Sequence, residues 1–206
     1  MPGRSTRERL SGPQRRERIL AAGAEVFAAR GYRATSVEDI ARAAGVTKPV
    51  LYDHFASKRG LFASIMESAR DELSTLGAQA MSADAPPDAR LRAAVDTFFS
   101  LVERKPAQAR VLLVAGRGEP ELSDAVHAVQ EEATARIAAL LAAEPQLGDA
   151  PDLLLLAEFV KRGMHGLAEW WQHHPSTPRA TLVDTVIDLT WTGLRSRYAS
   201  AEQGDG

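Results

Sequence analysis

Apolar residues recur every three to four positions along most of this chain, which is the spacing of one buried face on an α-helix. The pattern predicts helices over residues 14–30, 35–44, 48–55, 58–80, 88–104, 107–115, 121–143, 152–173 and 179–198. Gly or Pro marks the breaks between many of these segments. No stretch alternates as a strand would, and no internal repeat is visible. We therefore expect an all-α protein of about nine helices.

Two short helices joined by a tight turn form the most distinctive stretch, residues 35–61. Thr35 is a suitable N-cap for the first, with Glu38 at the position of a capping box. Gly45 supplies the left-handed residue that ends this helix. Thr47 can cap the second helix, and Pro49 falls in its first turn, where a missing N–H costs little. This arrangement is a helix-turn-helix, the unit that places its second helix in a DNA major groove.

Cations at two helix N-termini favour DNA over a purely structural hairpin. Lys48 begins the second helix, and Lys58 and Arg59 begin the next. Each opposes the helix dipole by a few tenths to about 1 kcal/mol. A bound anion reverses that sign, because the backbone N–H groups and the cation then face it together. Phosphate is the expected anion.

The segment KPVLYDHFASKRGLF, with IARAAGV before it, resembles the tetracycline-repressor (TetR) family of bacterial transcription regulators over roughly residues 15–66. The resemblance implies a recognition helix over residues 48–55, although many members carry Gly where this chain has Pro49. It implies base contacts from Lys48, Pro49 and Val50, and phosphate contacts from Tyr52, His54 and Lys58. Thr35 and Thr47, at the two predicted N-caps, complete the expected DNA-binding set.

Charge is divided unevenly along the chain. Residues 1–60 hold 12 Lys+Arg and 6 Asp+Glu, a net charge of +6, whereas residues 61–206 hold 13 and 21, a net charge of −8. We expect a flexible arm over residues 1–13, whose Arg4, Arg7 and Arg9 can reach phosphates, and a DNA-binding domain over residues 14–60. A larger helical domain is expected over residues 61–199, and a frayed tail over residues 200–206.

Bulky side chains in the middle helices can line a cavity. We expect the ligand-binding residues to be Phe98, Phe99, Leu112, Phe159, Met164, His165 and Trp170. In the family that the sequence resembles, such pockets bind small hydrophobic or amphipathic effectors. Aromatic and Met residues at helical spacing are, however, more often plain core. The adjacent His173 and His174 point apart, so no metal site is expected.

The last two helices carry more apolar residues than one packed face requires, so we expect them to form a homodimer. Internal core is the alternative interpretation of this surplus. No nucleophile-elbow, phosphate-loop, dinucleotide or zinc-protease motif is present, so we expect neither an enzyme nor a cofactor. The chain has no Cys, no apolar run long enough to span a membrane and no secretory signal, which fits the cytoplasm.

The sequence thus predicts a ligand-responsive transcriptional regulator, most often a repressor in this family, that binds a palindromic operator as a dimer. The alternatives are a helical small-molecule-binding or scaffold protein without sequence-specific DNA binding, and a protein that coats DNA regardless of sequence. The cations at Lys48, Lys58 and Arg59 argue against the scaffold.

Overall fold

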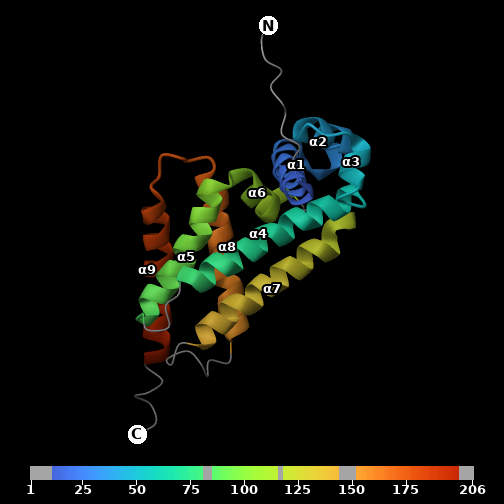
Figure 1. Ribbon diagram of the computed structural model, residues 1–206. Coiled ribbons are helices and arrows are strands. Elements are labelled where there is room, and N and C mark those ends of the chain that lie inside the picture. The colour runs from blue at the N-terminus through green and yellow to red at the C-terminus, as the bar shows by residue number, and fades with distance from the viewer. Residues whose placement is uncertain (1–10, 81–84, 116–117, 144–151, 200–206) are drawn as a thin grey trace.

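The computed structural model describes residues 11–80, 85–115, 118–143 and 152–199 (Figure 1). Within these residues the chain forms nine α-helices and no strand, which confirms the predicted all-α fold. The α-helices are α1 Gly12–Ala34, α2 Val37–Ala44, α3 Lys48–Tyr52, α4 Lys58–Ala80, α5 Pro87–Arg104, α6 Pro106–Arg110, α7 Ser123–Ala142, α8 Leu153–Trp171 and α9 Arg179–Ala199. A π-helical turn, η1 Val111–Ala115, continues α6, and a 3₁₀ turn, η2 Pro120–Leu122, precedes α7.

The first helix begins earlier than predicted. Ser11 is its N-cap and forms a capping box with Gln14, so residues 12 and 13 belong to α1 and not to an arm. Gly31 interrupts the helix with φ 76° and ψ 167°, close to the predicted end. The rest of the predicted arm, with Arg4, Arg7 and Arg9, lies outside the described residues, as does the predicted tail.

Helices α1–α3 form a head at one end of α4, and helices α5–α9 form the body (Figure 1). Helix α4 starts in the head and runs into the body beside α7, so it joins the two parts covalently (Figure 1). The apolar core of the head continues into the body, because Val111, Leu122 and Val129 belong to the same buried cluster. A second cluster holds α5, α8 and α9 together around Phe99 and Trp171.

Tyr32 lies at the centre of the junction between head and body. Its ring is 2% exposed and packs within 5.7 Å of the Phe27 ring and 5.4 Å of the Phe62 ring. Lys58 at the start of α4 donates to the carbonyl oxygens of Tyr32 and Thr35, both at 3.1 Å, and its Nζ lies 4.2 Å from the centre of the Tyr32 ring. These contacts fix the α1–α2 connection against α4.

The turn η2 supplies a second, non-covalent link to the head. The Tyr32 hydroxyl donates to Glu121 Oε2 at 3.2 Å, and Arg33 forms an ion pair with Glu119 at 3.5 Å. Leu122 is fully buried in the core of the head. The body therefore holds the head through α4, through η2 and through the packing of α6 and η1 on α1.

One charged side chain is buried between α7 and α8. Lys161 is 3% exposed, and its Nζ contacts Gln130 O at 2.9 Å, Thr134 Oγ1 at 2.6 Å and Glu158 Oε2 at 2.6 Å. The hydrogen bonds that Glu158 receives, first from Lys161 and then from Thr134 and Arg162, lower its pKa to about 2. Because the ammonium group is surrounded by three acceptors, this charge can remain in the interior.

None of the described helices combines the length and the apolar character needed to cross a bilayer.

Tyr32 should make stability depend on pH in the alkaline range. Burial and the nearby Glu121 raise its pKa from 10.0 to about 12. A raised pKa stabilises the fold below the unfolded value, and this contribution is lost as the pH rises through the folded value. We expect the free energy of unfolding of the Tyr32→Phe variant, measured by urea denaturation, to fall less between pH 10 and 12 than that of the wild type. Tyr52→Phe, at an exposed tyrosine, is the control and should behave as the wild type; equal slopes for all three proteins would contradict the assignment.

Candidate nucleic-acid interface and ligand cavity

The N-cap of α2 is Ser36 and not Thr35 as predicted. Asp39 N donates to Ser36 Oγ at 3.1 Å, and Ser36 N donates to Asp39 Oδ2 at 3.2 Å, so the capping box lies one residue later than the sequence suggested. The hydrogen bonds from the Ser36 hydroxyl and backbone lower the pKa of Asp39. Thr35 is 2% exposed and its hydroxyl donates to Gly31 O at 2.7 Å, so a DNA contact by this side chain is contradicted.

The turn between α2 and α3 has the geometry that the sequence predicted. Gly45 is left-handed, with φ 64° and ψ 35°, and Val46 N donates to Ala41 O at 2.9 Å. Thr47 occupies the N-cap position of α3, but its side chain makes no capping hydrogen bond there. Helix α3 ends at Tyr52 and not at residue 55, and a turn follows in which Phe55 N still donates to Leu51 O at 3.0 Å.

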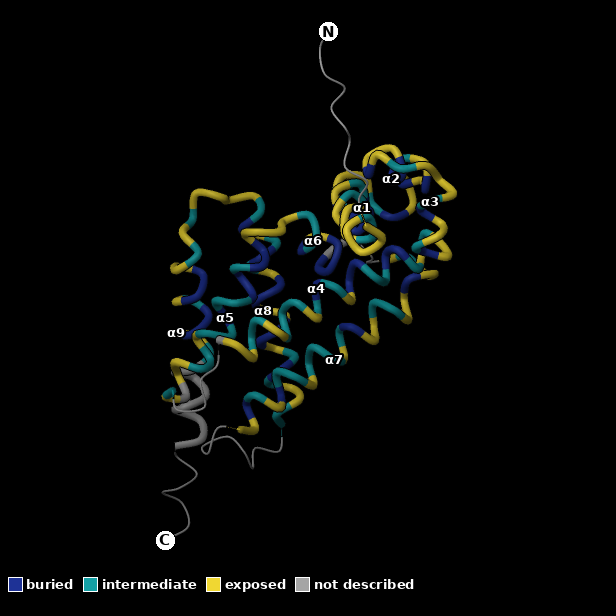
Figure 2. The backbone as a smooth tube through the Cα atoms, viewed as in Figure 1, coloured by how far each residue is buried: buried dark blue, intermediate teal, exposed yellow. Residues whose placement is uncertain are grey.

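Burial separates the two sides of α3. Leu51 is fully buried and anchors the helix, whereas Thr47, Lys48 and Pro49 are exposed and Tyr52 is 43% exposed. Val50 and His54 are half-buried. Figure 2 shows the exposed residues along α3 and the turn after it. Four of the eight predicted DNA-binding residues therefore lie on α3, and Thr47 and His54 flank it.

Two of the predicted cations already have protein partners. Lys48 is paired with Glu38, and their hydrogen bond raises the pKa of Lys48 and lowers that of Glu38. The carboxylate that the sequence suggested for a capping box is therefore the counter-ion of the recognition segment. Lys58 holds Tyr32 and Thr35, as described above, which is a structural role that the sequence did not predict. Its phosphate contact stays a prediction.

An apolar cavity of about 390 Å³ lies in the body between α4, α5, α7 and α8. Of the seven predicted ligand-binding residues, Phe98, Leu112, Met164 and His165 line it. Phe99 does not, because it is fully buried in the core of α5, α8 and α9. Phe159 and Trp170 are 71% and 45% exposed on the outer side of α8, so they also lie outside the cavity.

Most of the cavity wall was not predicted from the sequence. The wall includes Gly77 on α4, where a Cβ would meet no atom within 4 Å, and several small and aliphatic residues of α7. It also includes Arg70, Arg136 and Lys161.

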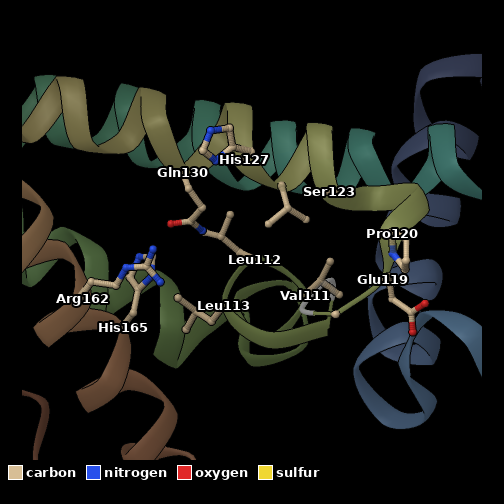
Figure 3. Close-up of a pocket in the computed structure, with 12 residues that line it drawn as sticks. Val111, Leu112, Leu113, Glu119, Pro120, Ser123, His127, Gln130, Arg162 and His165 are labelled. Carbon is tan, nitrogen blue, oxygen red and sulfur yellow. The ribbon is translucent and has the colours of Figure 1, made fainter.

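A second cavity of about 420 Å³, which we call the chamber, lies between η1, the N-terminal half of α7, and α8 (Figure 3). Gln130 reaches from α7 into the space between Leu112 of η1 and the pair Arg162 and His165 of α8 (Figure 3). His165 is 9% exposed and its ring stacks on Phe98 at 5.7 Å. Glu119 and Pro120 close the chamber at the end nearest the head (Figure 3).

The described residues contain no group of three His, Cys, Asp or Glu side chains that could hold a metal ion. His173 and His174 each bond a backbone oxygen one turn earlier, Glu169 O at 3.1 Å and Trp170 O at 2.9 Å.

Proteins that resemble this chain in sequence or in fold are transcription regulators. FasR of Mycolicibacterium smegmatis, an HTH-type transcriptional activator, is 29% identical over 187 residues, which cover 90% of this chain and 85% of that protein. EthR of the same organism, an HTH-type transcriptional regulator, is 30% identical over 149 residues, 71% of this chain and 68% of that protein. The structure of FadR from Bacillus subtilis in complex with stearoyl-CoA superposes with a TM-score of 0.73 at 20% identity, covering 84% of this chain and 96% of that one.

Two family profiles match the chain. Residues 19–65 match the bacterial regulatory proteins of the tetR family, and residues 87–193 match a tetracyclin repressor-like C-terminal domain. The first match covers the capped α2, the turn and α3, and the second covers α5 to α8 and most of α9. The chain is therefore a DNA-binding transcriptional regulator and belongs to the TetR family.

Proposed function

We propose that this protein binds a palindromic operator in double-stranded DNA as a homodimer and is released by a small amphipathic effector. The observation that carries the proposal is the exposed side of α3, mounted on a head that α4 and η2 connect to a body with an apolar cavity. No catalytic step is part of this proposal, and the protein acts in the cytoplasm, where bacterial DNA lies. Release from DNA can end either repression or activation of transcription. Which of the two the protein exerts depends on where the operator lies.

The proposed DNA contacts come from the exposed side of α3 and the turn after it. Lys48, Pro49 and Val50 face the base edges, and Tyr52 and His54 face phosphates. Lys58 lies next to them, and it also holds the α1–α2 connection in place. Thr47 offers a hydroxyl that makes no capping bond in α3 and is exposed.

The Lys48–Glu38 pair gives a test in which two matched substitutions act in opposite directions. Lys48→Gln removes a cation that contacts base edges and should weaken binding of the specific site by about 1–3 kcal/mol. Glu38→Gln removes a carboxylate that repels phosphate, so it should strengthen binding at the same salt. Fluorescence anisotropy with the DNA upstream of the protein's own gene measures both. Arg92→Gln, which removes an arginine on α5 paired with Asp184, is the control and should leave binding unchanged. The interface is wrong if both substitutions leave the affinity for this DNA unaltered.

A stripe on the outer side of α8 supports the proposed homodimer. Leu155 and Phe159 are 68% and 71% exposed, and Gly163 and Gly166 continue the stripe, where a Cβ added to either would meet no atom within 4 Å. Leu189 on α9 is 75% exposed. Such a run of large apolar side chains is typical of a surface that another chain covers. A twofold axis between two bodies would let both α3 helices meet major grooves about 34–36 Å apart.

A charge in this stripe should separate the subunits. Phe159→Glu would bury a carboxylate without a partner in the dimer, so we expect a monomer in sedimentation and a large loss of operator affinity. Phe159 is exposed on α8 and belongs to no buried cluster of the head, so the substitution should leave the packing of the head intact. Ala128→Glu, at an exposed position on α7, controls for the added charge. A dimeric Phe159→Glu protein would place the interface elsewhere.

The cavity supports an effector with an apolar chain. Its volume is within the range of small-molecule sites, about 300–1,000 Å³. FadR, whose fold this chain shares, was crystallised with stearoyl-CoA. We therefore propose an acyl chain as the part of the effector that fills the apolar cavity.

Gly77→Leu should fill the cavity without harming the fold. A side chain at this position meets open space, and replacing a helical Gly gains about 0.8–1 kcal/mol of helix propensity. We expect an unchanged or higher melting temperature, unchanged operator binding and loss of the response to decanoyl-CoA. A variant that still releases DNA with decanoyl-CoA as the wild type does would show that the effector binds elsewhere.

A further inference from the structure

Gln130 lies where the apolar cavity and the chamber meet. Its side chain lines both of them, together with Leu112 and His165. Figure 3 shows the side chain reaching from α7 toward Arg162 and His165 of α8. A ligand that extends from one cavity toward the other therefore has to pass Gln130.

The side-chain oxygen of Gln130 has no partner. Its Oε1 is buried and accepts no hydrogen bond in the part of the chain that the structure describes. The backbone of the same residue is held in place, because Gln130 O accepts from Lys161 Nζ at 2.9 Å and from Thr134 Oγ1 at 3.0 Å. The terminal torsion of Gln is soft, so Oε1 can turn toward a ligand in either cavity. Buried polar groups are rarely left without a partner, so this oxygen indicates a ligand that brings a donor.

The charges in the wall of the apolar cavity are already balanced. Its described wall contains three cations, Arg70, Arg136 and Lys161. Arg70 and Arg136 both bind Glu132, at 2.7 and 2.6 Å. Lys161 binds Glu158 at 2.6 Å. An anion in this cavity would have to displace one of these carboxylates, and a buried charge without a partner is costly.

The charged groups of the chamber are paired as well. Arg162 binds Glu158 at 2.7 Å. Glu119, the one carboxylate in the described wall, pairs with Arg33 at 3.5 Å. His127 lies 3.0 Å from the carboxylate one turn later on α7. Both walls therefore favour an uncharged ligand.

We propose that the effector carries an uncharged hydrogen-bond donor, an amide N–H or a hydroxyl, next to its apolar chain, and that this donor binds Gln130 Oε1. The inference rests on the proposed function, because the chain fills the apolar cavity. A carboxylate does not meet the requirement, since it only accepts hydrogen bonds. A coenzyme A thioester meets it if its phosphates stay in solvent, because its pantetheine arm carries amide N–H groups.

Four probes with one chain length test this proposal: decanamide, decanol, N,N-dimethyldecanamide and decanoate. Decanamide and decanol bring a donor. The dimethyl amide keeps the carbonyl group and the chain but has no N–H, and decanoate has a charge and no donor. Binding is measured by calorimetric titration, and release by loss of anisotropy of the operator DNA. Because the probes differ in solubility, the decisive quantity is the change in the affinity for each probe between wild type and variant.

Gln130→Met keeps the length of the side chain and removes the acceptor. We expect it to weaken binding of decanamide and decanol about tenfold and to leave binding of the dimethyl amide and decanoate unchanged. Operator affinity without a probe and the melting temperature should not fall, because no hydrogen bond to Oε1 is lost.

Gln172→Met is the matched control. Gln172 also has a buried side-chain atom without a partner, Nε2, but it lies outside the described walls of both cavities. This variant should bind all four probes as the wild type does.

Two results would overturn the inference and leave the proposed function standing. One is unchanged binding of decanamide and decanol by Gln130→Met. The other is weaker binding of the dimethyl amide by this variant, which would show that Gln130 donates a hydrogen bond to the effector. If no probe binds the wild type, or if Gly77→Leu binds them all as the wild type does, the proposed effector site fails, and the inference fails with it.

Decanoyl-CoA separates two sources of the donor. If Gln130→Met weakens binding of decanoyl-CoA as it weakens binding of decanamide, an N–H of the pantetheine arm reaches the same oxygen. If it weakens binding of decanamide and decanol alone, the donor of the effector is attached directly to the chain. Both results support Gln130 as the acceptor.

Discussion

The burial of Tyr32 is the constraint on which the arrangement of head and body depends. Its ring completes an aromatic cluster with Phe27 and Phe62, its carbonyl oxygen accepts from Lys58, and its hydroxyl donates to Glu121. One side chain thus connects α1, the start of α4 and the turn before α7. Because a buried phenol without a partner would be costly, the fold keeps η2 against the head as long as Tyr32 stays in the core. The position of α3 therefore depends both on the start of α4 and on η2.

Charge on the recognition segment is balanced in a way that composition does not show. The first 60 residues are net positive, yet Lys48 is neutralised by Glu38 and Lys58 is used to hold the α1–α2 connection. Binding to phosphate must therefore compete with contacts that already exist within the head. In the proposed interface, such competition would lower affinity for DNA of any sequence and leave a larger share of recognition to Pro49 and Val50. This balance favours sequence-specific DNA binding over binding to DNA of any sequence.

Helical periodicity predicted the fold, because each helix buries one face and the spacing of that face is local in the chain. It could not choose between neighbouring capping boxes. Thr35 with Glu38 and Ser36 with Asp39 have the same spacing, and the burial of Thr35 against Gly31 decides between them. Nor could it tell which apolar face of α8 points inward, so Met164 was placed correctly in the cavity and Phe159 was not. Lys161 has one partner at helical spacing, Glu158, but its other two, Gln130 and Thr134, lie 31 and 27 residues away on α7, a distance at which pattern carries no information.

The two cavities of the body adjoin, because Leu112, Gln130 and His165 lie in the walls of both. The wall of the apolar cavity includes Leu73 and Gly77 of α4, the helix that starts in the head, so a ligand in this cavity contacts one of the links between body and head. The chamber has Glu119 and Pro120 in its wall, and these residues belong to the segment that Tyr32 and Arg33 hold. Each cavity thus has part of a link between body and head in its wall, α4 in the apolar cavity and the segment before α7 in the chamber. A ligand in either cavity changes the affinity for DNA only as far as it binds one position of the head more tightly than another.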